Sequence, residues 1–175
     1  MKKILIPVTN HATLGTTDQA NGTYSPELTH ALHVLLEAGF DYDIASIKGG
    51  EAPLYGTDIE GDSVNKDLLN NQTLQSKIKN TIPVSNINIE DYDAVFYPGG
   101  FGLLNDLASN KDFAALSAKH YENGGIIAAV CHGPAALVDV KLTDGSYLVA
   151  NKVVNGFTNE EERLFGQKWS GQFDF

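Results

Sequence analysis

Short apolar runs alternate along the chain with segments of helical periodicity. The apolar runs predict buried strands over residues 3–9, 42–47, 94–97 and 126–130. Amphipathic spacing predicts one helix that starts at Ser25 and stops at Gly39, and a second helix over 111–122. Strand, helix and strand in succession imply parallel strands joined by a right-handed crossover. The pattern therefore predicts an α/β fold, a doubly wound and mostly parallel sheet with helices on both faces.

Two parts of this pattern lead to more specific expectations. The run 126–130 is the most apolar of the chain, so we interpret it as the central strand. Residues 48–90 combine a long surface loop over 49–62 with short helical pieces before Pro83, and such excursions often carry binding or interface functions.

The last third of the chain carries weaker local signals. Asp144-Gly145 predicts a hairpin turn between two short strands, and 153–154 predicts another short strand. Thr158-Asn159 offers a cap for a helix that begins at Glu160.

Composition narrows the class of protein. The 175 residues are 42% hydrophobic and 19% charged, which is typical of one globular domain. With 12 Lys and Arg against 22 Asp and Glu, the net charge of −10 argues against nucleic-acid and anionic-membrane partners. No stretch approaches 18 apolar residues, so we expect no membrane span. A single cysteine and a start without a signal peptide favour a cytoplasmic location.

That cysteine, Cys131, is the strongest candidate for chemistry. One cysteine forms neither an internal disulfide nor a Cys-based zinc site. It stands where an apolar run gives way to a helix, with a small residue two positions before it and Gly133 two positions after it. This spacing is typical of a nucleophile elbow. We expect the helix N-terminus behind it to lower the pKa of the thiol. A buried structural cysteine is the alternative.

Five other positions are candidates for the same site. His132 follows the thiol directly and is a possible base or ion-pair partner, and its N–H is a possible oxyanion donor. Gly99 and Gly100 end a neighbouring strand and offer further backbone donors. Glu27, in the first turn of a helix, and Glu162, in an acidic cluster, are possible partners of the thiol. Helix-start carboxylates and a plain turn are the alternatives.

Metal and nucleotide sites have little support in the sequence. His30 and His33 have a spacing that can bind metal, but no acidic third ligand is fixed nearby, so we predict no metal site. The glycines at 99, 100 and 102 do not form a dinucleotide fingerprint, and no phosphate loop of the Gly-Lys-Ser/Thr type is present. We therefore expect no cofactor.

Taken together, these motifs resemble those of the ThiJ/PfpI family. The resemblance rests on residues 128–134 around the cysteine, on 97–100 and on 25–27, and extends from Lys3 to about Gly166. Within the family the chain looks most like the branch of glutathione-independent glyoxalases (glyoxalase III) and heat-shock-type chaperone/deglycases. The family implies a flavodoxin-like fold, commonly dimeric.

The resemblance also implies roles for individual residues. Cys131 matches the nucleophile, His132 the triad histidine and Glu162 the triad acid of this branch. Glu27 matches the buried acid that contacts the thiol, and Gly99 and Gly100 match the oxyanion region. The implied reaction converts methylglyoxal to lactate without a cofactor. Cys131 attacks the aldehyde, and Glu27 or His132 then moves a proton between the two carbons before hydrolysis.

Several alternatives follow from the same resemblance. Family members are described as repairing glycated proteins, as cysteine peptidases or amidases, and as holdase chaperones; a redox-sensor thiol is a further option. The His-x-Glu pair of class I glutamine amidotransferases is absent from the sequence, which argues against glutaminase activity. Relatives also continue beyond the segment that ends near Gly166. We therefore expect residues 1–175 to form a single domain without the family's last strand and helix, and the tail 167–175 to diverge.

Overall fold

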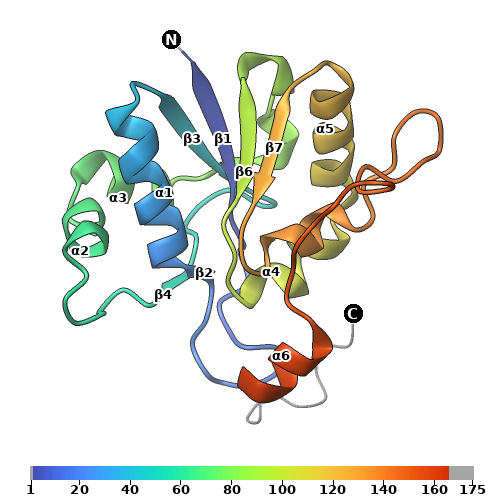
Figure 1. Cartoon of the computed structure of the whole chain (residues 1–175). Helices are drawn as coiled ribbons and strands as arrows, with labels where there is room; N and C mark the ends of the chain where they lie inside the picture. The colour runs from blue at the N-terminus through green and yellow to red at the C-terminus, as the bar shows by residue number, and fades with distance from the viewer. Residues whose placement is uncertain (1, 166–175) are drawn as a thin grey trace.

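A five-stranded sheet runs through the middle of the protein, and every pair of neighbouring strands in it is parallel (Figure 1). The computed structural model describes residues 2–165. In spatial order the strands are β5 (Ile82–Pro83), β3 (Asp41–Ser46), β1 (Lys3–Pro7), β6 (Ala94–Tyr97) and β7 (Ile126–Ala129). The chain builds the sheet outward from β1 in one direction and then in the other, so the predicted doubly wound α/β fold is confirmed.

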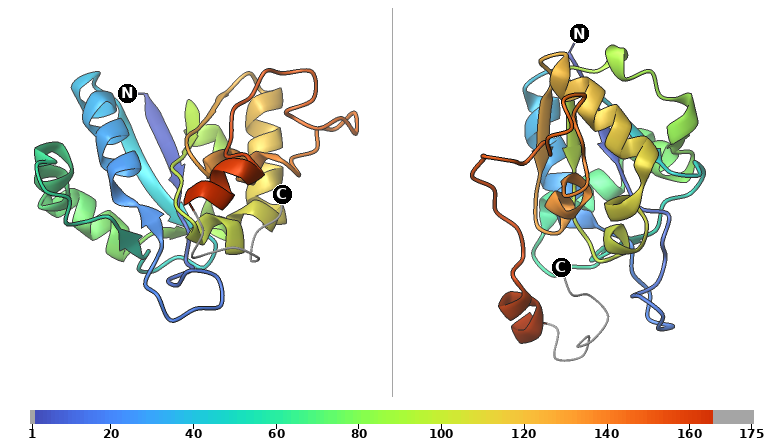
Figure 2. Two further views of the ribbon diagram at one scale, coloured as in Figure 1. Left: turned by 60° about the horizontal axis from the view of Figure 1, so that its bottom comes forward. Right: turned by 90° about the vertical axis from the view of Figure 1, so that its right-hand side faces the viewer.

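Helices lie on both faces of this sheet (Figure 2). Their bounds are α1 (Ser25–Glu37), α2 (Ser63–Leu69), α3 (Gln72–Lys79), α4 (Gly102–Asn105), α5 (Lys111–Glu122) and α6 (Asn159–Phe165). Successive residues of a strand point to opposite faces, and this alternation divides the core in two. Ile4 and Ile6 of β1 pack with α1 and α3, whereas Leu5 packs on the side of α5.

Local sequence signals explain where the main helices begin and end. Pro26 occupies the start of α1, where a missing N–H costs nothing, and Gly39 follows its end with a φ of 79°. The side chain of Asn110 caps α5 by accepting a hydrogen bond of 2.9 Å from the backbone N–H of Phe113. The predicted helices from Ser25 and over 111–122 are both confirmed.

The excursion over 48–90 contains the helical pieces α2 and α3, as predicted, and two short strands, β4 and β5, that were not predicted. Within the expected surface loop, β4 (Leu54–Tyr55) pairs in parallel with β2 (Thr23–Tyr24), which directly precedes α1. This small second sheet brings part of the excursion to the beginning of α1.

The predicted place of the 126–130 run is wrong. β1 is the central strand, and β7 lies at the edge of the sheet. The β7 side chains that face α5 are partly buried, while Ile126 on the other face is 65% exposed. A run of apolar residues predicted burial on both faces, but apolar composition alone does not decide which strand has two neighbours.

The predicted strand at 153–154 is also wrong. Among the described residues these two valines belong to no strand, and Val153 is fully exposed. β-Branched residues favour a strand only where a partner strand is available, and none pairs with them. The predicted hairpin at Asp144-Gly145 is present as a turn closed by one antiparallel bridge, between Lys141 and Tyr147, and not by two strands.

Within residues 2–165, no helix is long and apolar enough to cross a membrane. The predicted divergent tail, 167–175, lies outside the described residues.

Substitution of Leu32 tests whether α1 is held by packing. Leu32 is fully buried in the core between α1 and the sheet. Leu32→Ala leaves a cavity there, so we expect the free energy of unfolding to fall by about 2–5 kcal/mol. The control is Val34→Ala on the same helix, whose side chain is 62% exposed; it should change the value by less than about 0.5 kcal/mol. Urea unfolding followed by circular dichroism measures both, and equal losses would contradict this assignment of the core.

Candidate active site

Cys131 occupies a sharp turn between β7 and the short 3₁₀ helix η4 (Gly133–Leu137). Its backbone has a φ of 58°, a left-handed conformation that non-glycine residues rarely adopt. The turn is so tight that a Cβ at Gly133 would lie 2.3 Å from the carbonyl oxygen of Tyr97. Strained backbone of this kind is concentrated at functional sites. The structure therefore contains the strand–turn–helix geometry that the spacing around Cys131 predicts.

A second turn, at Gly99 and Gly100, lies beside the first because β6 and β7 are neighbours in the sheet. A Cβ at Gly99 would lie 2.6 Å from a carboxylate oxygen of Glu27 and 2.8 Å from the Cβ of Cys131. Only glycine allows this approach. The N–H of Gly99 donates a 2.8 Å hydrogen bond to Oε2 of Glu27, whereas the N–H groups of Gly100 and His132 act on the Cys131 sulfur.

Glu27 reaches the same point from the first turn of α1. Burial raises the pKa of its carboxyl group, while hydrogen bonds from Cys131 and from the N–H of Gly99 partly offset that rise. The carboxyl group and the thiol are therefore in direct contact inside the protein.

Because of this contact, the pKa of the Cys131 thiol is raised and not lowered as the sequence predicted. Burial, followed by the charge of Glu27 and the hydrogen bond to it, raises the pKa of Cys131 to about 12. The N–H groups of His132 and Gly100 lower the pKa, but they do not outweigh these effects. The predicted lowering is wrong because η4 is a five-residue 3₁₀ helix with little dipole, and because the nearest charge is negative.

His132 connects the thiol to Glu162. Its Nδ1 lies 3.2 Å from the Cys131 sulfur, and its Nε2 is hydrogen-bonded to Oε1 of Glu162. The imidazole is 5% exposed. Glu162 stands on α6, which starts at the predicted cap; there Thr158 and Glu161 form a reciprocal capping box that was not predicted. The structure thus brings all four predicted side chains together from distant parts of the chain.

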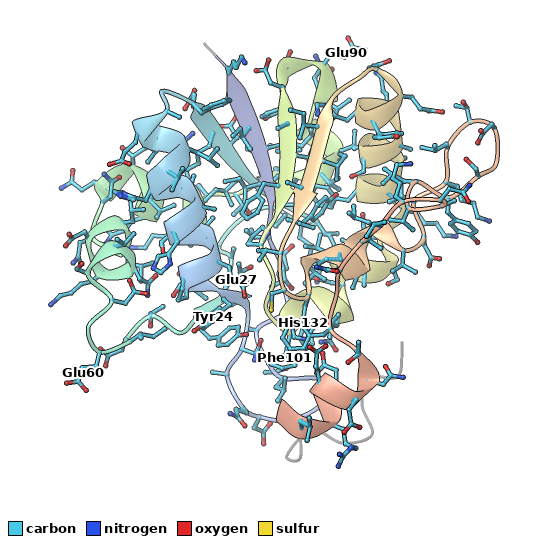
Figure 3. The ribbon with its side chains drawn as sticks, in the orientation of Figure 1. Tyr24, Glu27, Glu60, Glu90, Phe101 and His132 are labelled. Atoms are coloured by element: carbon cyan, nitrogen blue, oxygen red, sulfur yellow. The ribbon has the colours of Figure 1, made fainter. Side chains whose placement is uncertain are left out.

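Two aromatic rings that no sequence motif predicts pack against His132. The ring of Phe157 stacks on the imidazole at 4.4 Å with an interplanar angle of 13°, and the ring of Phe101 packs at 4.5 Å and 42°. Figure 3 shows Phe101 and His132 together at the end of the sheet, with Glu27 close by. Phe101 follows the glycine turn directly and Phe157 precedes the Thr158 cap, but no spacing rule connects positions so far apart.

A tyrosine from the small β2–β4 sheet also borders the site. The ring centroids of Tyr24 and Tyr55 are 5.0 Å apart. Burial, and then the charges of Glu27 and Cys131, raise the pKa of Tyr55. The excursion over 48–90, expected to carry function, thus contributes a phenol group near the thiol.

The histidines considered as metal ligands have other partners. His30 pairs with Asp62 at 2.9 Å, and His33 lies 3.6 Å from Glu37 on the same helix. Across the part of the chain that the structure describes, no group of three or more His, Cys, Asp or Glu side chains has an arrangement that would hold a metal ion.

Comparison with known protein families shows to which family the chain belongs. The model of the DJ-1/PfpI family matches residues 19–170. The chain belongs to the DJ-1/PfpI family. The resemblance predicted from the motifs around Cys131, Gly99 and Glu27 is therefore confirmed.

Similar proteins include named glyoxalases. The glutathione-independent glyoxalase HSP31 of Saccharomyces cerevisiae is 34% identical, with 94% of this chain and 72% of the relative covered. Among solved structures, REP24 of Francisella tularensis matches with a TM-score of 0.88 at 33% identity, over 96% of this chain and 75% of that one. Glyoxalase III of Candida albicans matches with a TM-score of 0.82 at 26% identity, over 94% and 72%.

Neutralising Glu27 should make the thiol of this family member more acidic. In Glu27→Gln the adjacent negative charge is gone, and the amide can donate a hydrogen bond to the thiolate while its oxygen accepts from Gly99. We expect the midpoint of the pH dependence of Cys131 alkylation to lie above the ordinary thiol value of about 8.5 in the wild type. In the variant it should move to lower pH.

Glu37→Gln is the matched control, because Glu37 lies on the same helix but is exposed, and within residues 2–165 its ion-pair partner is His33. It should leave the alkylation midpoint unchanged. A midpoint that stays the same, or rises, in Glu27→Gln would contradict the assigned effect of Glu27 on the thiol.

Proposed function

We propose that this protein is a cofactor-independent cysteine enzyme of the glyoxalase III type, which converts 2-oxoaldehydes such as methylglyoxal to 2-hydroxy acids such as lactate. The observation that carries the proposal is the arrangement around one sulfur atom. Glu27 contacts the thiol on one side, and His132 on another side leads to Glu162. Relatives that are named glutathione-independent glyoxalase and glyoxalase III support the same reaction.

The first step is attack by the Cys131 sulfur on the aldehyde carbon. The thiol proton passes to the carboxylate of Glu27, whose pKa is raised by burial and which is therefore a better base than an exposed glutamate. The aldehyde oxygen becomes an alkoxide beside the N–H groups of Gly100 and His132, which are aimed at the sulfur. Return of the proton from Glu27 to this oxygen gives a neutral hemithioacetal.

The second step moves a proton between the two substrate carbons. A base removes the proton from the former aldehyde carbon, the resulting enediol is protonated at the neighbouring carbon, and a thioester of the 2-hydroxy acid remains. Both Glu27 and His132 contact the sulfur, so either group is within reach of the carbon attached to it. Water then hydrolyses the thioester and restores the thiol, so that the sum is methylglyoxal plus water to lactate.

Glu162 acts in this scheme by holding the imidazole. Its carboxylate accepts from Nε2, which leaves Nδ1 directed at the sulfur and fixes the tautomer of the ring. The predicted homodimer, the cytoplasmic location and action on glycated or unfolded proteins stay predictions.

Removal of the sulfur tests the proposal directly. Cys131→Ala should reduce lactate formation from methylglyoxal to the uncatalysed rate, because no other group of the site forms the hemithioacetal. Lactate is measured enzymatically after removal of the protein, and circular dichroism confirms that the variant is folded. Full activity in Cys131→Ala would refute the mechanism.

A pair of substitutions on α6 tests the role of Glu162. Glu162→Gln keeps the shape of the side chain but removes the charge that holds His132, and we expect kcat/KM for methylglyoxal to fall by about 10²-fold. Glu160→Gln, two positions away, removes an exposed ion pair with Arg163, and it should retain nearly full activity. Equal effects of the two substitutions would show that Glu162 contributes only to the helix.

A further inference from the structure

A cavity of about 400 Å³ opens beside the reactive thiol, on the α5 side of β7. Cys131 and His132 belong to its lining, together with β7, η4 and the segment 149–157 that returns along them. The mechanism above uses the thiol and the imidazole but not the rest of this space.

The size of the cavity does not fit methylglyoxal alone. That substrate has only five non-hydrogen atoms and occupies on the order of 100 Å³, if about 30 Å³ per water molecule in the liquid is taken as the scale. A cavity of about 400 Å³ lies instead within the range of about 300–1,000 Å³ that is typical of sites for larger ligands. When methylglyoxal is bound, most of the cavity would still be filled with water in contact with apolar walls.

The side chains that line the cavity indicate which kind of chemical group it would bind. Apart from Cys131 and His132 at the reacting end, the lining residues that the structure describes are apolar except for Asn155, and none of them is Lys, Arg, Asp or Glu. Leu137 and Val149 form parts of the wall, and so does Phe157, whose ring stacks on His132. In a chain with a net charge of −10, an uncharged lining beside the catalytic thiol favours an uncharged apolar group and excludes a charged one.

We propose that this cavity is a subsite for the substituent of the substrate, and that the enzyme prefers 2-oxoaldehydes with a bulky apolar or aromatic group over methylglyoxal. The inference rests on the proposed function, because it requires a dicarbonyl bound at Cys131. With the aldehyde carbon at the sulfur, the substituent on the adjacent keto carbon lies along η4 and the 149–157 segment. The steps of the reaction are unchanged, and an aromatic 2-oxoaldehyde gives the corresponding 2-hydroxy acid.

Two adjacent valines provide a matched test. Val154 lines the cavity, whereas Val153 does not and is fully exposed. Val154→Asp places a carboxylate in the apolar wall, and Val153→Asp adds the same charge one residue away in solvent. Val154 is itself 58% exposed, so neither substitution is expected to unfold the protein.

The measurement is kcat/KM for phenylglyoxal and for methylglyoxal with the full-length chain. We expect the wild type to use phenylglyoxal at least about tenfold better, since even one methylene in an apolar pocket changes kcat/KM by roughly 10–200-fold. Val154→Asp should lower the ratio of phenylglyoxal to methylglyoxal at least about tenfold, by the same reasoning. Val153→Asp should leave the ratio unchanged.

The outcomes separate this inference from the function on which it rests. Turnover of methylglyoxal with a wild-type ratio at or below one overturns the subsite and leaves the proposed function intact. Equal changes of the phenylglyoxal-to-methylglyoxal ratio in Val153→Asp and Val154→Asp would also overturn the subsite and leave the proposed function intact. Absence of turnover with either substrate overturns the proposed function and the subsite together.

Discussion

The close approach of Glu27, Gly99 and Cys131 is the constraint on which the site depends. Three segments meet there, and the 2.8 Å hydrogen bond from the N–H of Gly99 to Glu27 leaves no room for any side chain at position 99. The positive φ of Cys131 turns its sulfur toward the same carboxyl group. Because the group is buried, its pKa is raised, and the pKa of the thiol rises with it. The ionisation of each group therefore depends on the other, whereas in water the two groups would ionise separately.

The parallel sheet is what makes this approach possible. β1, β6 and β7 end at the same edge, so the segments that follow them converge there although they are far apart in sequence (Figure 1). α6 comes from still farther along the chain. Glu162 of α6 is hydrogen-bonded to His132. Phe157, in the segment before α6, stacks its ring on the same imidazole. The same returning segment forms a wall of the cavity beside the thiol, so it both orients the imidazole and shapes the space for substrate.

Much of this arrangement could be predicted from the sequence, because it rests on local rules. Helix caps, glycine turns and apolar runs located α1, α5 and β6, and the small residues around Cys131 located the elbow. What could not be predicted depends on contacts between distant segments. The edge position of β7, the rings of Phe101 and Phe157 around His132, and the raised pKa of the thiol have no signature in local spacing.

The central claim is that the Cys131 sulfur bonds covalently to the aldehyde during turnover. Rapid acid quenching of the wild-type enzyme with saturating methylglyoxal, followed by peptide mass spectrometry, tests it most directly. The account predicts that the peptide containing Cys131 carries an adduct with the added mass of methylglyoxal, which forms within one turnover and disappears as the substrate is consumed. Lactate production at full rate with no modification of that peptide at any quench time would contradict it.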